Sequence, residues 1–231
     1  YTVTPTGTNG CPGTPFTITI TVQSEPVGSN DTDNTCSDVA LNYDLQANVT
    51  AVNGQDANFS WVAAPNGNVT GESTTAQTGD FINNTLTNVS GVNQTVIYTV
   101  TPTGTNGCAG NNFTITVTVQ SEPDGTNDTD LTCSDVAFNY DLQANVTAQN
   151  GQLADFSWVA ADNGNVTGES LGATSGDIIT DVLHNVSGSD QTVIYTVTPT
   201  GTNGCVGDDF TISVTVGSEP VGTDDTDVTC S

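Results

Sequence analysis

The sequence predicts an all-β protein in which immunoglobulin-like β-sandwich domains are repeated in tandem and set in a linear array. Three observations predict this fold class: an internal repeat of 97 residues, runs in which every second residue is apolar, and turn signals between those runs. Around seven short strands in ~95 residues are typical of such a sandwich. No segment sustains the apolar spacing of an amphipathic helix, so helices are not expected.

The repeat defines the domain organisation. The string YTVTPTGTNGC begins at Tyr1, Tyr98 and Tyr195, and the chain aligns with itself at this offset without insertion or deletion. A period of this length is too long for a solenoid turn and fits one small domain. We expect the chain to be a window of a longer protein. It divides into the end of an incomplete unit (1–29), two complete units (30–126 and 127–223) and the start of a further unit (224–231).

The alternating runs are the expected strands, and they are rich in Thr, Val, Ile and Tyr, as half-buried strands are. In the first complete unit the apolar positions are Val39, Leu41, Tyr43 and Leu45, then Val96, Tyr98 and Val100, then Phe113, Ile115, Val117 and Val119. Asn-Gly pairs supply the positive φ that tight turns need. The core is expected to hold the aromatic residues Phe59, Trp61, Phe156 and Trp158.

The cysteines occur twice in each unit, at Cys11, Cys36, Cys108, Cys133, Cys205 and Cys230. Without a CxxC motif, and with one histidine in the chain, they indicate extracellular disulfides rather than a metal site. Two pairings are open, across the spacing of 25 residues or across that of 72. We place Cys36 where the chain enters its unit, beside the hairpin that holds Cys108. The predicted bonds therefore lie within units, Cys36–Cys108 and Cys133–Cys205, with a bond between domains as the alternative. Cys11 and Cys230 are expected to have partners outside this window.

The charge is one-sided: the chain has no lysine or arginine and 26 acidic residues, for a formal net charge of −26. Nucleic-acid binding requires a basic surface, and so does attraction to an anionic membrane. Both are therefore excluded, and direct membrane insertion is not expected because no apolar run approaches ~20 residues. Without lysine, the chain also cannot form Lys–Asn isopeptide cross-links.

Part of the acidic charge is clustered where one unit follows another. Each junction has a glutamate followed six residues later by a D-x-D pair, and alternate residues of an extended segment point the same way. Oxygen ligands without nitrogen or sulfur donors favour Ca²⁺. We predict calcium sites at Glu25, Asp31 and Asp33, at Glu122, Asp128 and Asp130, and at Glu219, Asp225 and Asp227. A solvated acidic linker is the alternative interpretation.

Catalysis is not expected. His184 is the one histidine, and Thr87 occupies the equivalent position of the preceding unit, so a repeated site cannot depend on it. General-base chemistry would then fall to carboxylates alone, such as the recurring pairs Glu72/Glu169 and Asp80/Asp177. We predict that the chain is not an enzyme.

Three motifs carry a resemblance that covers the whole chain: the YTVTPTGTNGC hairpin, the NYDLQANVTA segment and the FSWVAA strand. Together they resemble the PKD-like, immunoglobulin-like tandem repeats of large secreted surface adhesins of the Bacteroidetes type. The resemblance implies an extracellular, cell-surface location and fibres that mediate attachment or gliding.

The predicted function is that of a structural segment in an extracellular filament or adhesin stalk that extends a distal tip from the cell surface. Its partners would be adjacent repeats of the same chain or identical subunits of a fibre. Two alternatives stay open. The repeats themselves could bind glycans or surfaces, with Tyr43 and Tyr140 as candidates for an aromatic platform, or they could pack side by side in a surface layer or sheath.

Overall fold

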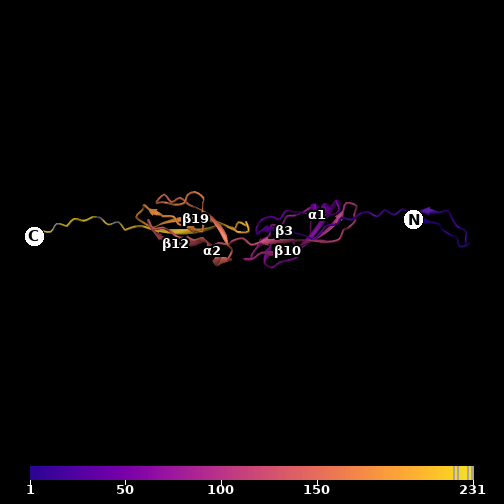
Figure 1. Cartoon of the computed structure of the whole chain (residues 1–231), viewed down its shortest axis with the longest axis horizontal. Coiled ribbons are helices and arrows are strands. Elements are labelled where there is room, and N and C mark those ends of the chain that lie inside the picture. The colour runs from indigo at the N-terminus through magenta and orange to yellow at the C-terminus, as the bar shows by residue number, and fades with distance from the viewer. Residues whose placement is uncertain (221, 223, 228, 230–231) are drawn as a thin grey trace.

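The computed structural model describes residues 1–220, 222, 224–227 and 229. It shows two β-sandwich units that lie end to end along the long axis of the molecule (Figure 1). Strands dominate both units, so the predicted fold class is confirmed. The incomplete unit contributes a short antiparallel hairpin of β1 (Thr2–Val3) and β2 (Phe16–Thr17).

The first complete unit is built on a five-stranded sheet in the order β3-β11-β10-β5-β7. Its strands are β3 (Asp31–Cys36), β5 (Ala57–Ala63), β7 (Gln77–Thr78), β10 (Gln94–Gly104) and β11 (Phe113–Gln120). Strand β3 runs parallel to β11, from Asp31 opposite Ile115 to Cys36 opposite Gln120, whereas β10 is antiparallel to its neighbours. Two small sheets complete the unit: β4 (Tyr43–Asp44) with β8 (Phe81–Ile82), and β6 (Val69–Thr70) with β9 (Thr87–Asn88).

The second unit repeats this topology, with the sheet order β12-β20-β19-β14-β16. The main strands are β12 (Asp128–Cys133), β14 (Ala154–Ala160), β16 (Thr174–Ser175), β19 (Gln191–Gly201) and β20 (Phe210–Gly217). The small pairs are β13 (Tyr140–Asp141) with β17 (Ile178–Ile179), and β15 (Val166–Thr167) with β18 (His184–Asn185).

Each unit has its own core, which lies on one face of its main sheet. The alternating residues of β10 and β11 are almost fully buried, as predicted, because every second side chain of a strand faces the same side. Trp61 is 6% exposed and Trp158 is 5% exposed, so the prediction that they are core residues is confirmed.

Each unit also contains a helix that the sequence pattern did not predict, α1 (Leu45–Val52) in the first and α2 (Leu142–Gln149) in the second. The carboxylate of Asp44 caps α1 by accepting a hydrogen bond from the backbone N–H of Ala47, and Leu45 is fully buried. The expected strand from Val39 to Leu45 is therefore wrong, apart from the two residues of β4. Eight residues are too few for helical periodicity to stand out from an alternating run. Within the described residues, no helix has the length and apolar character needed to cross a membrane.

Candidate functional site at the junction between the units

Each unit has two different ends, and the junction is made where unlike ends meet. The far end is where the first and last strands of the main sheet finish, at Cys36 and Gln120 in the first unit. The hairpin end is the opposite one, where the last two main strands turn at residues 105–112 in the first unit and 202–209 in the second. At the hairpin end the incoming linker is held by its own unit: the Asn106 side chain donates to the carbonyl of Ser24 at 3.0 Å, and Asn203 donates to Ser121 at 2.9 Å.

A disulfide joins the far end of the first unit to the hairpin end of the second. Cys36, the last residue of β3, is bonded to Cys205, with 5.5 Å between their Cα atoms and 169 residues between them in sequence. Because β3 runs parallel to β11, it carries Cys36 away from its own hairpin and toward the next unit. Cys205 is completely buried at this contact.

The predicted pairings Cys36–Cys108 and Cys133–Cys205 are wrong. The prediction placed Cys36 at the hairpin end of its unit, but β3 ends at the far end. The separation of 169 residues is the sum of the 72-residue cysteine spacing and one 97-residue repeat. The bond therefore joins the two cysteine positions that were predicted to pair, but it takes them from consecutive units instead of from one unit. Cys11, Cys108 and Cys133 are free thiols, and Cys230 lies outside the described residues.

Non-covalent contacts surround the disulfide. The Gln152 side chain donates a hydrogen bond of 2.7 Å from Nε2 to the backbone carbonyl of Gly91. A Cβ atom at Gly91 would lie 3.2 Å from both the carbonyl oxygen and the Cβ of Asn150. Glycine at position 91 therefore allows the two backbones to approach closely.

Four carboxylates line a cavity of about 330 Å³ at the junction: Asp38, Glu122, Asp124 and Asp208. Burial raises the pKa of Glu122 to about 7, with further increases from the negative charges of Asp38, Asp208 and Asp124 and from a hydrogen bond to Asp38. No lysine or arginine exists to offset these charges. Near pH 7, Glu122 is therefore about half protonated, and its protonated carboxyl donates a hydrogen bond to Asp38 across the boundary between linker and first unit.

In each of the first two sets, the predicted calcium ligands lie on two different segments of the chain. Asp31 and Asp33 lie on β3, Asp128 and Asp130 lie at the equivalent positions of β12, and each glutamate lies in the linker that precedes these strands. In the part of the chain that the structure describes, no three Asp, Glu, His or Cys side chains are arranged to hold a metal ion. Asp225 and Asp227 are exposed and lie outside any strand. Calcium binding stays a prediction.

The carboxylate of Asp31 is engaged in a different contact. It accepts a hydrogen bond of 2.7 Å from the hydroxyl of Tyr43, and this bond lowers the pKa of Asp31. Burial, followed by the bond to Asp31, raises the pKa of Tyr43 to about 12. Tyr140 and Asp128 repeat the pair in the second unit. Both tyrosines are partly buried against their cores, so neither presents a freely exposed ring.

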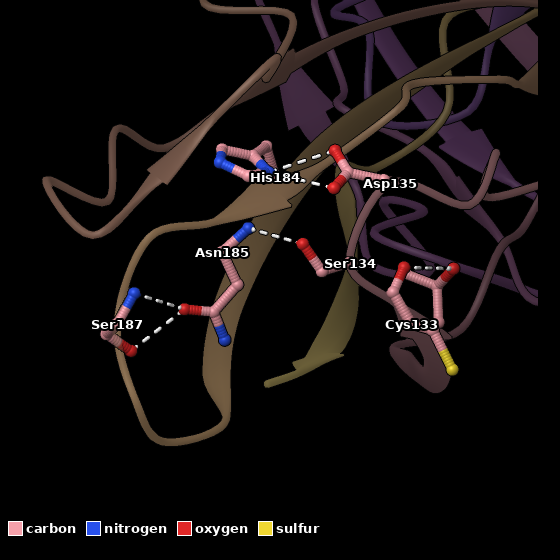
Figure 2. A network of polar contacts seen from close by, with 7 residues as sticks. Cys133, Ser134, Asp135, His184, Asn185 and Ser187 are labelled. Atoms are coloured by element: carbon pink, nitrogen blue, oxygen red, sulfur yellow. Dashed lines mark hydrogen bonds and ion pairs between the residues drawn. The ribbon is translucent and has the colours of Figure 1, made fainter. Parts of the chain in front are cut away.

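His184 lies at the far end of the second unit (Figure 2). Its Nδ1 atom is 2.9 Å from a carboxylate oxygen of Asp135, and both side chains are about half exposed. The hydroxyl of Ser134 accepts a hydrogen bond from the backbone N–H of Asn185 and makes no hydrogen bond with the imidazole in the described part of the chain. This Ser-Asp-His cluster therefore lacks the serine–imidazole contact that nucleophilic catalysis requires.

Sequence reasoning missed the residues that complete the junction, above all Gly91 and Gln152. Both recur 97 residues away, as Gly188 and Gln55, but so do most residues of the repeat. Recurrence alone could not single them out.

Comparison with known proteins identifies the repeated unit. The family model for the PKD-like domain matches residues 1–26, 33–123 and 130–220. No curated protein matches the chain. Its fold is similar to that of a SusE-like surface-located polysaccharide-binding protein of Bacteroides thetaiotaomicron (12% identity, 83% of this chain and 33% of that one, TM-score 0.36). It is also similar to the FN1–FN3 domains of chicken CNTN1 (13% identity, 94% of this chain and 75% of that one, TM-score 0.37).

These structural similarities carry no functional argument, and the chain spans a third of the SusE-like protein's length. The family matches, in contrast, cover most of the chain, in the same tandem order as the observed hairpin and the two units. The expected resemblance to PKD-like repeats is thereby confirmed. The chain belongs to the PKD-like domain family.

Proposed function

We propose that the chain is a structural segment of an extracellular filament or adhesin stalk, in which PKD-like units set end to end hold a distal tip away from the cell surface. The observation that carries this proposal is the bond between Cys36 and Cys205, which fastens consecutive units in a line (Figure 1). A side-by-side lattice would instead need contacts along the flanks of the units. The role is structural rather than catalytic.

The chemistry of the junction supports an extracellular location. Structural disulfides persist in oxidising compartments and are rare in the cytosol. The partners of each unit are the preceding and following units.

The test is to shorten the native protein by in-frame deletion of whole units in the source cell. A stalk predicts thin fibres, seen by negative-stain electron microscopy, whose length falls in proportion to the number of units, while the tip remains intact. A periodic layer in place of fibres would establish the sheath alternative. Glycan binding by the two-unit chain on an array, lost when Tyr43 and Tyr140 are replaced by Ala, would establish the binding alternative.

We also propose that calcium binds at the junctions. The support is electrostatic: a net charge of −26 without any basic side chain makes neighbouring units repel, and bound cations offset that repulsion. Addition of EDTA should lower the melting temperature, and calcium should restore it, whereas replacement of Asp31 and Asp33 by Asn should weaken the response because it removes one of the predicted sites. An identical melting curve with EDTA and with calcium would refute calcium binding and leave the stalk proposal standing.

A further inference from the structure

One extended segment of the chain passes through both units. Between Cys108 and Cys133 there is no helix and no turn: the segment consists of residues 108–112, β11, the linker of residues 121–127, and β12. It begins at the hairpin end of the first unit and finishes at the far end of the second. At ~3.3 Å per residue, such a segment spans roughly 80 Å and has little slack.

Both ends of this segment are free thiols whose equivalents are bonded at the junction. Cys133 lies 97 residues after Cys36, and Cys108 lies 97 residues before Cys205. Cys133 is exposed at the far end of the second unit, and Cys108 is partly exposed at the hairpin end of the first.

The surfaces around these thiols also repeat the surfaces that the junction covers. Gly188 corresponds to Gly91, but a Cβ atom built on Gly188 meets only open space. Gln55 corresponds to Gln152, which donates to Gly91 across the junction. The far end of the second unit and the hairpin end of the first thus carry two different surfaces that are complementary to each other. Such a heterologous interface, when it does not close on itself, builds an open row.

We propose that the far end of the second unit binds the hairpin end of another copy of this unit, and that Cys133 forms a disulfide with that copy's hairpin cysteine. A row of units then contains two staggered covalent spines. Each spine is an unbroken path through the last strand of one unit, the linker, the first strand of the next unit, and a disulfide into the unit after that.

Bond formation requires an oxidant, and a small-molecule or protein disulfide supplies it. One cysteine thiolate attacks this disulfide and releases one thiol. The partner cysteine then displaces the second thiol and forms the S–S bond, so two cysteines are oxidised as one disulfide is reduced to two thiols.

The spines determine which residues experience tension. In the first unit, one spine follows β3 to Cys36 and continues into Cys205 and β20, and the other begins at Cys108 and follows β11. The intervening residues 37–107 lie on neither path, so pulling on a row does not extend the fold that they form. The two spines lie side by side in each unit, because β3 and β11 are paired in parallel. This holds whether the row serves as a stalk or as part of a sheath.

The first test extends the chain in register by one further complete unit and maps its disulfides after oxidation with oxidised glutathione. Peptide mapping without reductant should recover Cys36–Cys205 and a second bond from Cys133 to the hairpin cysteine of the added unit. Tryptophan fluorescence confirms that the units are folded. Recovery of Cys133 as a free thiol, or in a bond within its own unit, would overturn the proposal.

The second test pulls the 231-residue chain by its ends in a force spectrometer. With Cys36–Cys205 intact, no domain-sized unfolding step should occur. After reduction, two steps should appear, each of roughly 300 Å for about 90 residues. Joint replacement of Cys36 and Cys205 by Ser should give the same two steps without reductant.

The matched control is Cys133→Ser, which should leave the two-unit trace unchanged because the partner of Cys133 is absent there. In the chain with the added unit, the same substitution should remove the second bond from the peptide map. Two domain-sized steps in the oxidised two-unit chain would contradict the proposed path of tension.

Discussion

At the far end of the first unit Cys36 is bonded to the next unit, whereas at the far end of the second unit the equivalent Cys133 is an exposed thiol. The two ends have the same strand register and the same left-handed aspartate after the cysteine, with φ of 59° at both Asp38 and Asp135. They differ in their surroundings: the far end of the first unit contacts the hairpin end of a following unit and, within the described residues, the far end of the second unit does not. The bond is therefore a property of neighbouring units and not of the unit itself.

The two far ends also differ in polar detail. At the first, Asp38 accepts a hydrogen bond from Thr87 and faces Glu122 in the acidic cavity. At the second, Asp135 pairs with His184 (Figure 2). Matched substitutions at the two ends therefore separate the effect of the junction from that of the local fold.

The largest expected effect follows from removal of the interdomain bond. Joint replacement of Cys36 and Cys205 by Ser should lower the free energy of unfolding by about 5 kcal/mol, because a cross-link over 169 residues restricts the unfolded chain. Urea denaturation of the oxidised protein measures this change. The matched pair, Cys108→Ser with Cys133→Ser, should leave the midpoint where it is. An equal loss in both double variants would mean that the bond contributes nothing specific.

The next effect depends on pH. Folded Glu122 holds its proton up to about pH 7, whereas a solvated glutamate with a pKa near 4.5 has already lost it. The native state therefore binds more protons in this interval, and its stability falls as the pH rises from about 4.5 to about 7. Glu122→Gln keeps a donor for Asp38 and removes the charge.

The variant should thus gain about 1 kcal/mol over the parent protein above pH 7, after allowance for solvent screening, and nothing below pH 4.5. Thermal melts across this range supply the measurement. Glu219→Gln, at the equivalent exposed position after the second unit, is the control. A pH profile identical to that of the parent protein would show that Glu122 is not protonated at the junction.

A smaller effect is expected from the close backbone approach. Gly91→Ala should cost up to about 1 kcal/mol, because its methyl group would press on Asn150 and shift the contact made by Gln152. Gly188→Ala should be neutral in this chain, since open space surrounds that position. Denaturation curves of both variants test the difference, and equal costs would place the effect within each unit.

The smallest effect is expected at the one ion pair of the described residues. His184→Thr recreates the residue found in the first unit and should change the stability by a few tenths of a kcal/mol, as is usual for exposed pairs. Melts at low and high salt provide the measurement. A loss well above 1 kcal/mol would show that the pair organises the far end of the second unit.

The all-β class, the tandem arrangement and the strand cores followed from local pattern. The 97-residue period and the alternation in β10 and β11 depend on neighbouring residues, and the fold preserves both. The helix that begins at Leu45 was not predicted, because one capping aspartate and two buried apolar positions form too short a pattern. In the candidate site, the cysteine spacing predicted correctly that the first-strand cysteine bonds with a hairpin cysteine. It did not predict that the hairpin cysteine belongs to the next unit.

By itself, the sequence determined that this is a repeated, acidic, β-rich protein with two cysteines in each unit, because composition and periodicity are properties of the chain alone. Only the tertiary structure decided that Cys36 bonds with Cys205 and that Glu122 meets Asp38. The physical reason is that β3 pairs in parallel with β11, so its last residue, Cys36, lies at the end of the sheet that faces the next unit. Two cysteines 72 residues apart in the sequence can lie at the same end of a unit or at opposite ends, and the direction of the strand that carries the first one decides which.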